Sequence, residues 1–560
     1  MFLILSAIVI IILYYYSTRN FNYFAKRKIK YEPPIPIFGN HSQVVFARLT
    51  EIERISAIYN KYQNEKVVGY FRGTTPDLIV RDPELLKHIF NLDFLQFHQR
   101  GLGRDPKYEP VMLNLFSADG DRWKLVRHGL SPAFTSSKLK SMFPIIVECA
   151  EKLEQVAMKL ALQKEDFDFV DLSSRFTIEI IGSCGFGIEM DTMNNEHCLF
   201  LQLRDMIFIK SIWQIVLFGI RDLFPNSIIK RIPISRPDIM RIINEIVNGI
   251  RRQRLENNIT RNDFMNLLLE IQKNGKITGE SLEETDENGK PKQVEIEFDD
   301  AYVSAQLFIF FAAGFETAST AMSFTMHQLA YHPEIQRKIQ EEIDTVLSKY
   351  DNKLCFEAVN EMTLLECAFK EAMRLFPPGG LTTRFCAKEF KVPNSNITIE
   401  AGTRLIIPIQ AIHMDPKYFD NPTEFRPDRF TPDATKSRHK YVYLPFGEGP
   451  RKCIGARLGI VETMAGLAAI LRKFTVEPSP LSTRDIVRRK TSYLVQAVEG
   501  GLPCRLTLRE QYQEKKCENA QEVPNHETLK KTKVTQRYSC YANSELTKGS
   551  QLVESIVELS

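Results

Sequence analysis

The longest helical pattern in the chain runs from Asp299 or Asp300 to Tyr331 and ends at a His-Pro pair. Thirty residues of helix span about 45 Å, which is enough to cross a whole domain. Glu316 is the only Asp, Glu, Lys or Arg in its interior, so both a membrane span and a buried core helix must be weighed. An interior glutamate among many Ser and Thr side chains favours the core helix, which predicts a large, mainly helical domain.

The domain around this helix is predicted to be continuous from residue 40 to residue 508, because neither a Gly/Ser linker nor an internal repeat interrupts it. An apolar fraction of 44% is ample for a core. The predicted fold class is mainly α with a small β region. The strand-like stretches are Lys66–Phe71, Asp77–Val80, Phe390–Val392, Ile397–Ile399 and Arg404–Ile407.

Two polar stretches lie outside these elements. Lys273–Val294, rich in Gly, Glu and Lys, is predicted to be a loop ahead of the long helix. Residues 509–560 are polar, carry balanced charge and lack apolar periodicity, which predicts a disordered C-terminal tail.

The N-terminus predicts a membrane anchor over residues 1–24. Phe2–Tyr16 is almost purely apolar, and no small-residue cleavage site follows it. The segment is short compared with the roughly 20 residues of a membrane span, so it is expected to extend into the membrane interface through Phe21, Tyr23 and Phe24. Residues 25–39 are predicted to form a basic flank and a stiff proline hinge. The positive-inside rule then places the body in the cytoplasm.

Charge and cysteine usage exclude several classes of function. The chain has 73 basic and 69 acidic side chains, and its net charge of +4 gives no overall attraction to nucleic acid. Its ten cysteines include no C-x-x-C pair and no repeated spacing, so they encode neither a zinc site nor a disulfide framework. One of them, Cys453, lies in an unusual sequence context.

The sequence around Cys453 is F-G-E-G-P-R-K-C-I-G, from Phe446 to Gly455. Glycines give such a loop the freedom to present a sulfur atom to iron, and backbone N–H groups aimed at the sulfur would stabilise a thiolate. Arg451 can meet a haem propionate, and Phe446 can shield the sulfur from water. The alternative is an inert cysteine in a glycine-rich turn before a helix. The whole ten-residue constellation favours ligation of haem iron by Cys453.

This stretch matches F-x-x-G-x-R-x-C-x-G at every fixed position, and the chain thereby resembles the cytochrome P450 superfamily over residues 30–508. The resemblance implies the cytochrome P450 fold and haem b (iron protoporphyrin IX) as the cofactor. Leu130–Thr135 and Phe310–Thr317 are similar to the insect microsomal, xenobiotic-oxidising group. Leu458, where that group usually carries Phe, is a departure expected to affect packing beside the haem rather than ligation.

Glu316 and Thr317 on the long helix are the candidate catalytic residues. Activation of dioxygen requires two protons in an otherwise dry pocket, and an acid next to a hydroxyl can relay them. A mid-helix threonine can instead merely bond to the carbonyl four residues before it, here that of Ala313. The resemblance favours the relay, because residues 313–317 match the superfamily's [AG]-G-x-[DE]-T pattern.

Trp123 and Arg127 lie four residues apart, so they share a helix face and can converge on one carboxylate. The superfamily uses W-x-x-x-R to bind a haem propionate. Arg384 fits a second propionate-binding position, and Arg100 is a weaker candidate by position alone. The alternative for these residues is that they are solvated surface cations.

Glu371 and Arg374 are, by themselves, an ordinary i,i+3 pair on a helix. Pro427-Asp428-Arg429-Phe430 resembles the superfamily's P-x-R-F element. Together with this element, Glu371 and Arg374 resemble the superfamily's E-x-x-R pair. The resemblance implies that Glu371, Arg374 and Arg429 form a buried network behind the cysteine loop. Its role would be structural, because removal of one member strands a buried charge.

The reaction implied by the resemblance is NADPH-dependent monooxygenation of a lipophilic small molecule, such as a xenobiotic, plant toxin, insecticide, hormone or lipid. The chain has no G-x-G-x-x-G motif or P-loop of its own. Electrons are therefore expected from NADPH-cytochrome P450 reductase at the endoplasmic reticulum membrane, with cytochrome b5 as a second candidate donor. An acidic donor would dock on a basic patch made of Arg122, Lys124, Lys138, Lys140 and Lys452.

Two other functions remain open at this point. One is a haem-thiolate isomerase or dehydratase that needs no external electrons. The other is a non-catalytic haem sensor. Product formation that depends on NADPH and a reductase distinguishes the monooxygenase from both.

Overall fold

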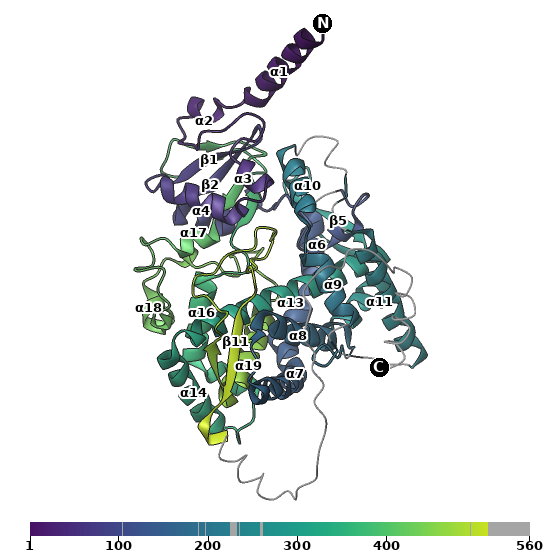
Figure 1. The fold of residues 1–560 in the computed structure, drawn as a ribbon. Helices are drawn as coiled ribbons and strands as arrows, with labels where there is room; N and C mark the ends of the chain where they lie inside the picture. The colour runs from purple at the N-terminus through teal and green to yellow at the C-terminus, as the bar shows by residue number, and fades with distance from the viewer. Residues whose placement is uncertain are drawn as a thin grey trace, which may run out of the picture.

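The structure is a computed structural model that describes residues 1–102, 105–188, 190–195, 198–224, 232–233, 236–257, 261, 263–492 and 494–512. Helices make up most of it, and Figure 1 shows them gathered below a smaller sheet region from which helix α1 projects. The α-helices are α1 (Phe2–Thr18), α2 (Tyr23–Lys26), α3 (Ser42–Val45), α4 (Glu51–Lys61), α5 (Pro83–Lys87), α6 (Gly120–Leu130), α7 (Ser136–Gln163), α8 (Phe169–Ile181), α9 (Leu199–Phe208), α10 (Ile212–Leu223), α11 (Pro237–Glu256), α12 (Phe264–Lys273), α13 (Asp300–Ala330), α14 (Pro333–Ser348), α15 (Phe356–Glu361), α16 (Thr363–Leu375), α17 (Ile409–His413), α18 (Pro432–Lys436) and α19 (Ala456–Lys473).

Within the described residues, the strands form four small sheets. The largest has the order β1 (Val67–Arg72), β2 (Thr75–Val80), β9 (Arg404–Ile407) and β6 (Thr382–Phe385), with β2 and β9 parallel. The others join β10 (Phe474–Pro478), β11 (Pro503–Leu508) and β3 (Phe167–Asp168); β4 (Lys276–Thr285) and β5 (Pro291–Glu297); and β7 (Phe390–Lys391) and β8 (Thr398–Ile399). All five predicted strand stretches are present, which confirms a mainly α fold with a small β region. The sequence patterns did not predict β3, β6, β10 and β11.

Helix α13 is the core helix that its composition predicts. The Asp299 side chain caps it by accepting a hydrogen bond from the Tyr302 N–H at 3.0 Å. Two helical segments of the described chain are long and apolar enough to cross a membrane, Phe2–Lys26 and α13. The apolar window of α13 is 61% buried, against 6% for the N-terminal segment. Helix α13 packs against α8, α16 and α19, so its apolar side chains serve the core.

The N-terminal segment departs from its prediction at Phe24. Helix α1 is exposed along its apolar residues, as expected of an anchor. Phe24 is instead fully buried, with its ring centroid 4.9 Å from that of Phe71 in β1. Gly69 leaves room for this ring, because a Cβ there would lie 2.5 Å from Phe24 Cδ2. Phe24 therefore belongs to the core and not to a membrane interface, a distinction that apolar composition alone does not make.

The polar stretch predicted as a loop is instead an antiparallel hairpin of β4 and β5. Its turn is built by Asp286, whose Oδ1 accepts hydrogen bonds from the Asn288 and Lys290 N–H groups at 2.9 and 2.8 Å. Gly289 completes the turn with a φ of 76°. Most of the hairpin is exposed, and β4 lacks the alternation of apolar and polar residues that reveals a strand in sequence. In β5 the alternation is confined to the short stretch from Val294 to Glu297. The predicted C-terminal tail lies, from residue 513 onward, outside the described residues.

Candidate functional site

Cys453 lies at the end of a tight loop that leads into α19. The Cys453 N–H donates to the Phe446 carbonyl at 2.9 Å, and the Lys452 N–H donates to the Gly449 carbonyl at 2.9 Å. Gly449 has a φ of 75°, and a Cβ there would lie 1.9 Å from the Phe90 carbonyl oxygen, so the position requires glycine. The Phe446 side chain is half-buried and packs on the main core.

The Cys453 thiol faces a space inside the protein. Its side chain is exposed, yet burial among protein atoms is the main reason that the pKa of this thiol lies above its usual value. Both observations hold for a group on the wall of an internal space. Ala313 is exposed in the same way, although it lies in the middle of the buried helix α13, so that helix also borders an internal space.

Several groups around the sulfur oppose the effect of burial. After burial, which raises the pKa of Cys453, a backbone hydrogen bond from Gly455 and the positive charges of Arg100, Arg127 and Lys452 lower it. Burial outweighs them, so the free thiol is protonated at neutral pH. A metal ion deprotonates a thiol that coordinates it. The surroundings therefore suit a sulfur that becomes charged only when a metal ion shares the charge.

Three guanidinium groups gather beside this loop with too few anionic partners. The Nε atoms of Arg100, Arg384 and Arg451, and Nη1 of Arg451, are buried and make no hydrogen bond. Asp119 is the carboxylate that meets them, at 2.9 Å from Arg451 Nη2. Burial, and then repulsion by a neighbouring guanidinium group, lowers the pKa of Arg384 strongly and that of Arg451 to about 9.

These residues fit haem b, which carries two propionate groups. A dianion beside the three arginines would supply the missing acceptors and relieve their mutual repulsion. Helix α6 contributes the two other predicted residues. The buried Trp123 ring lies 4.4 Å beneath the Arg451 guanidinium, and Arg127 is close enough to Cys453 to lower the thiol pKa. The predicted cofactor-binding residues are thus brought together, while the role of each stays a prediction.

Asp119 is a residue of this site that the sequence patterns do not single out. Its Oδ1 accepts a hydrogen bond from the Arg100 N–H at 2.7 Å, and its Oδ2 accepts one from the Gly101 N–H at 2.9 Å. With its bond to Arg451, Asp119 ties two arginine-bearing segments together just before α6. Its position four residues ahead of Trp123 was the available signal, but an aspartate before a helix usually indicates only a cap.

Glu316 and Thr317 lie one turn beyond Ala313 on α13. The Thr317 hydroxyl donates to the Ala313 carbonyl at 2.7 Å, so the back-bond expected of a mid-helix threonine is present. Its oxygen can still accept a hydrogen bond from water or substrate. Burial raises the pKa of Glu316 to about 7. A carboxyl with that pKa can both donate and recover a proton near neutral pH, and its part in a relay stays a prediction.

The predicted network behind the cysteine loop is confirmed. Arg374 binds both oxygens of Glu371, at 2.7 and 2.8 Å, and the Arg429 Nε atom lies 3.3 Å from the same carboxylate. The side chains of Glu371 and Arg374 are fully buried. Arg374 also donates to the carbonyl of His413, whose Nε2 accepts from the Leu444 N–H at 2.8 Å. The network is therefore linked to the segment from which the cysteine loop starts.

A mainly helical domain whose cysteine loop lies beside a cluster of unpaired guanidinium groups has the features of a haem-thiolate protein. The family model of cytochrome P450 matches residues 29–503, and the chain belongs to the cytochrome P450 family. The chain is 34% identical to cytochrome P450 6B7 of Helicoverpa armigera over 481 residues, covering 86% of this chain and 93% of that protein. It is also 34% identical to probable cytochrome P450 6a18 of Drosophila melanogaster over 497 residues, covering 88% and 96%. Haem b is the cofactor of this family.

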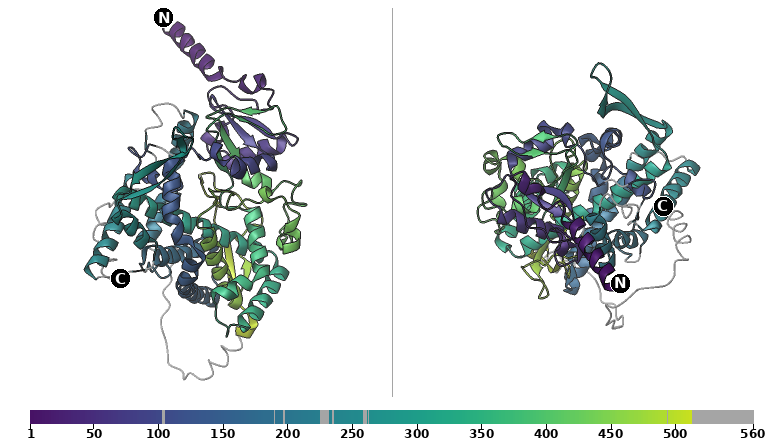
Figure 2. Two further views of the ribbon diagram at one scale, coloured as in Figure 1. Left: turned by 180° about the vertical axis from the view of Figure 1, so that it is seen from behind. Right: turned by 90° about the horizontal axis from the view of Figure 1, so that it is seen from above.

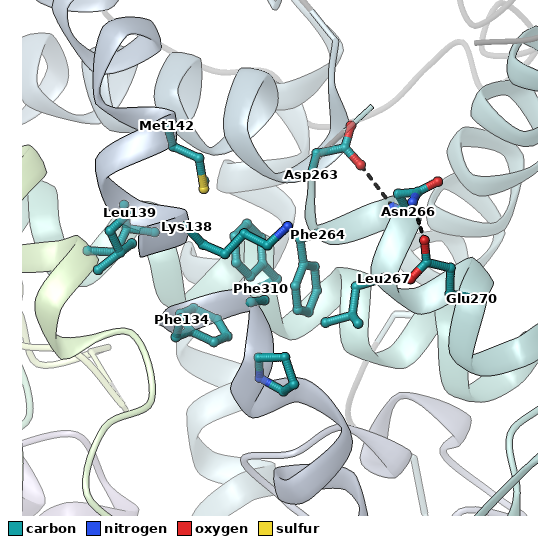
Figure 3. Close-up of a pocket in the computed structure, with 13 residues that line it drawn as sticks. Phe134, Lys138, Leu139, Met142, Asp263, Phe264, Asn266, Leu267, Glu270 and Phe310 are labelled. Atoms are coloured by element: carbon teal, nitrogen blue, oxygen red, sulfur yellow. Dashed lines mark hydrogen bonds between the residues drawn. The ribbon is translucent and has the colours of Figure 1, made fainter. Parts of the chain in front are cut away.

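Leu458 lines a cavity of about 110 Å³ beside the cysteine loop. Figure 3 shows this cavity between α7 and α12, with the rings of Phe134, Phe264 and Phe310 in its wall. Phe134 lies 3.8 Å from where a Cβ of Gly455 would stand. Leu458 thus borders open space near the loop, and an effect of this departure on packing rather than on ligation stays a prediction.

We expect Leu458→Phe to raise the thermal stability of the protein, because the larger ring removes apolar wall atoms from water. The gain should be about 1 kcal/mol, and the measurement is the midpoint of thermal unfolding. Leu467→Phe is the matched control on the same helix, since Leu467 is fully buried in the packed core and extra atoms there should cost about 1–3 kcal/mol. Equal destabilisation by both substitutions would contradict the expectation.

Proposed function

We propose that the protein is a monooxygenase that inserts one atom of O₂ into a lipophilic small molecule: R–H + O₂ + 2e⁻ + 2H⁺ → R–OH + H₂O. The observation that carries this proposal is the Cys453 thiol, on the wall of an internal space, beside guanidinium groups that lack anionic partners. The family supplies the cofactor class. Haem b held by the Cys453 thiolate would supply the chemistry of dioxygen activation, for which electron donation by a thiolate is suited.

The residues have distinct roles in this proposal. Cys453 ligates the iron, Phe446 shields the sulfur, and the propionates are held by Arg451, Trp123, Arg127 and Arg384. Arg100 and Asp119 hold Arg451 in place, since Arg100 Nη2 donates to the Arg451 carbonyl at 3.2 Å. Glu316 and Thr317 deliver protons, for which the raised pKa of Glu316 is suited.

The electrons come from NADPH through NADPH-cytochrome P450 reductase, with cytochrome b5 as a second donor, at the endoplasmic reticulum membrane. Two apolar surfaces support attachment to a membrane. Helix α1 is exposed, and α10 exposes Trp213 by 79% and Ile212 by 56%. Both helices lie at the same end of the molecule in Figure 1, so one membrane surface can contact both. A body facing the cytoplasm agrees with the basic residues that follow α1.

The experiment that tests this function is reconstitution of the full-length protein with NADPH-cytochrome P450 reductase. Substrates are sought among hormones, plant toxins and insecticides by the shift that binding causes in the Soret band. The proposal predicts an oxygenated product that requires both NADPH and the reductase. A product that forms without either would favour an isomerase or dehydratase.

Thr317→Ala is expected to lower the yield of product per NADPH by about tenfold, because the hydroxyl that passes protons is lost. The electrons should appear as hydrogen peroxide, while haem content and substrate binding stay unchanged. Thr325→Ala is the control, since Thr325 makes the same 2.7 Å back-bond on α13 but lies deep in the core. If the folded Thr317→Ala variant gives an unchanged yield of product per NADPH, Thr317 does not pass protons and serves only as part of helix α13.

The pH dependence of product yield follows from the pKa of Glu316, which burial raises to about 7. Below pH 7 the carboxyl carries its proton and can donate it, whereas above pH 7 it is ionised. Product per NADPH should therefore fall as the pH rises from 6 to 8, and Glu316→Gln should lower the yield and remove this dependence. The same pH profile in Glu316→Gln would assign the titration to another group.

A further inference from the structure

The hairpin of β4 and β5 lies along one flank of helix α6. In the first turn of α6, Asp121 accepts hydrogen bonds from the Ser281 hydroxyl at 2.6 Å and from the Leu282 N–H at 2.5 Å. In the last turn of α6, Gly129 lies against Ile277 of β4. A Cβ on Gly129 would stand only 3.2 Å from the Ile277 side chain. Residues 277–282 of β4 therefore contact both the first and the last turn of α6.

A second attachment lies at an irregularity in the hairpin. Strand pairing is interrupted between Glu280 and Thr285, which lets this part of β4 turn toward the body. Glu283 Oε1 accepts a hydrogen bond from Gln99 Nε2 at 3.1 Å and lies 3.1 Å from His98 Nε2. These contacts hold the hairpin against the segment that carries Arg100, so its orientation relative to the cysteine loop is set.

The hairpin is strongly acidic. Residues 276–297 contain seven carboxylates and three lysines, which gives a net charge of −4. All seven carboxylates are exposed, at Glu280, Glu283, Glu284, Asp286, Glu287, Glu295 and Glu297. Seen from above in Figure 2, the hairpin projects from the body, so its charge extends into solvent beside α6. Its field reaches about one Debye length, roughly 8 Å at physiological salt.

This acidic hairpin borders the basic patch expected to receive an acidic electron donor. Glu280 Oε2 lies 4.0 Å from Lys124 Nζ. Another cation of that patch, Lys140, pairs with Glu357 at 2.6 Å. Lys452, next to the cysteine, is exposed and makes no ion pair within the described part of the chain. The hairpin therefore adds negative charge beside Lys124, at one edge of the expected patch, in which Lys140 and Lys452 are exposed.

We propose that the β4–β5 hairpin is an acidic arm of the donor docking surface, which competes with an acidic electron donor for Lys124 and weakens its binding. This inference rests on the proposed function. The exposed pair of Lys124 and Glu280 contributes little stability by itself. The effect on the donor comes from the summed charge of the arm, because like charges slow association and destabilise an encounter complex.

The test neutralises the arm and leaves its attachment intact. The triple variant Glu280→Gln, Glu284→Gln, Glu287→Gln changes the arm's net charge from −4 to −1 and keeps Ser281 and Glu283, which hold it to the body. The control neutralises three exposed carboxylates elsewhere, through Glu334→Gln, Asp433→Asn and Glu477→Gln. The full-length proteins are titrated with NADPH-cytochrome P450 reductase at low and high ionic strength.

Neutralising the arm should lower the reductase concentration for half-maximal turnover about threefold to tenfold at low salt. The difference should shrink at high salt, and the control should change less than twofold. Turnover driven by an organic peroxide, which needs no donor, should stay unchanged. If the triple variant needs the same or a higher reductase concentration for half-maximal turnover, the hairpin does not weaken donor binding and the proposal is wrong. A failure of the proposed function would differ, because the unmodified protein would then show no reductase-dependent product at all.

Discussion

Replacing Cys453 by alanine is expected to abolish turnover completely, because the loop contains no second cysteine that could supply a thiolate. The neighbours of the thiol are arranged for a charged sulfur, with the Gly455 N–H and the cations of Arg100, Arg127 and Lys452 around it. Alanine would leave these groups without their anion and the haem without its thiolate ligand. The measurement is product formed per haem with NADPH and reductase present.

Cys386→Ala is the matched control for this substitution. Cys386 is likewise a free cysteine, but it is buried in the sheet region, with its sulfur 2.8 Å from the Lys388 carbonyl. Burial raises the pKa of its thiol to about 11, so it stays protonated. This variant should keep most of its activity per haem. Equal loss of activity in both variants would indicate that cysteine replacement damages the fold and not a ligand.

Glu371→Ala is expected to prevent accumulation of the haem-loaded protein. The substitution strands the fully buried guanidinium group of Arg374, which typically costs about 3–5 kcal/mol. That is a large part of the roughly 5–15 kcal/mol by which folded proteins are stable. Arg429 loses the same carboxylate but keeps its ion pair with Asp420 at 2.7 Å. The defect should also reach the cysteine loop, because Arg374 holds the His413 segment on which Leu444 rests. The measurement is the yield of haem per unit of expressed chain.

Glu366→Ala is the control for this substitution. It tests whether the loss of haem yield is specific to Glu371 or follows the removal of any glutamate from α16. Glu366 pairs with Lys370 at 2.9 Å on the partly exposed face of the same helix, and such pairs contribute about 0–1 kcal/mol. Its haem yield should stay near that of the unmodified protein. A normal yield in Glu371→Ala would show that the network is dispensable for haem incorporation.

Features with a strong local signal could be predicted from the sequence. The length and single interior charge of 300–331 were enough to predict α13 as a core helix. The loop around Cys453 likewise has glycine, at Gly447 and Gly449, where its backbone adopts a positive φ. The network of Glu371, Arg374 and Arg429 became predictable only through resemblance to a family. Its partners are 58 positions apart, and no local pattern joins them.

The remaining features depend on contacts that sequence patterns do not encode. Phe24 has the composition of a membrane segment, and only the space above Gly69 places it in the core. The hairpin of β4 and β5 is stabilised by contacts with α6 that lie 160 positions away in sequence, so its polar residues suggested a loop. The role of Asp119 could not be predicted for the same reason. Its partner Arg451 lies 332 positions further along the chain.

The position of the Soret band in the reduced, CO-bound protein tests the assignment of Cys453 most directly, since ligation of the haem by a thiolate would give a spectrum that other ligands do not give. The full-length protein is predicted to show the thiolate-type band, Cys386→Ala should retain it, and Cys453→Ala should lose it even where haem stays bound. A thiolate-type band that persists in Cys453→Ala would contradict the assignment, as would its absence from the unmodified protein with haem bound.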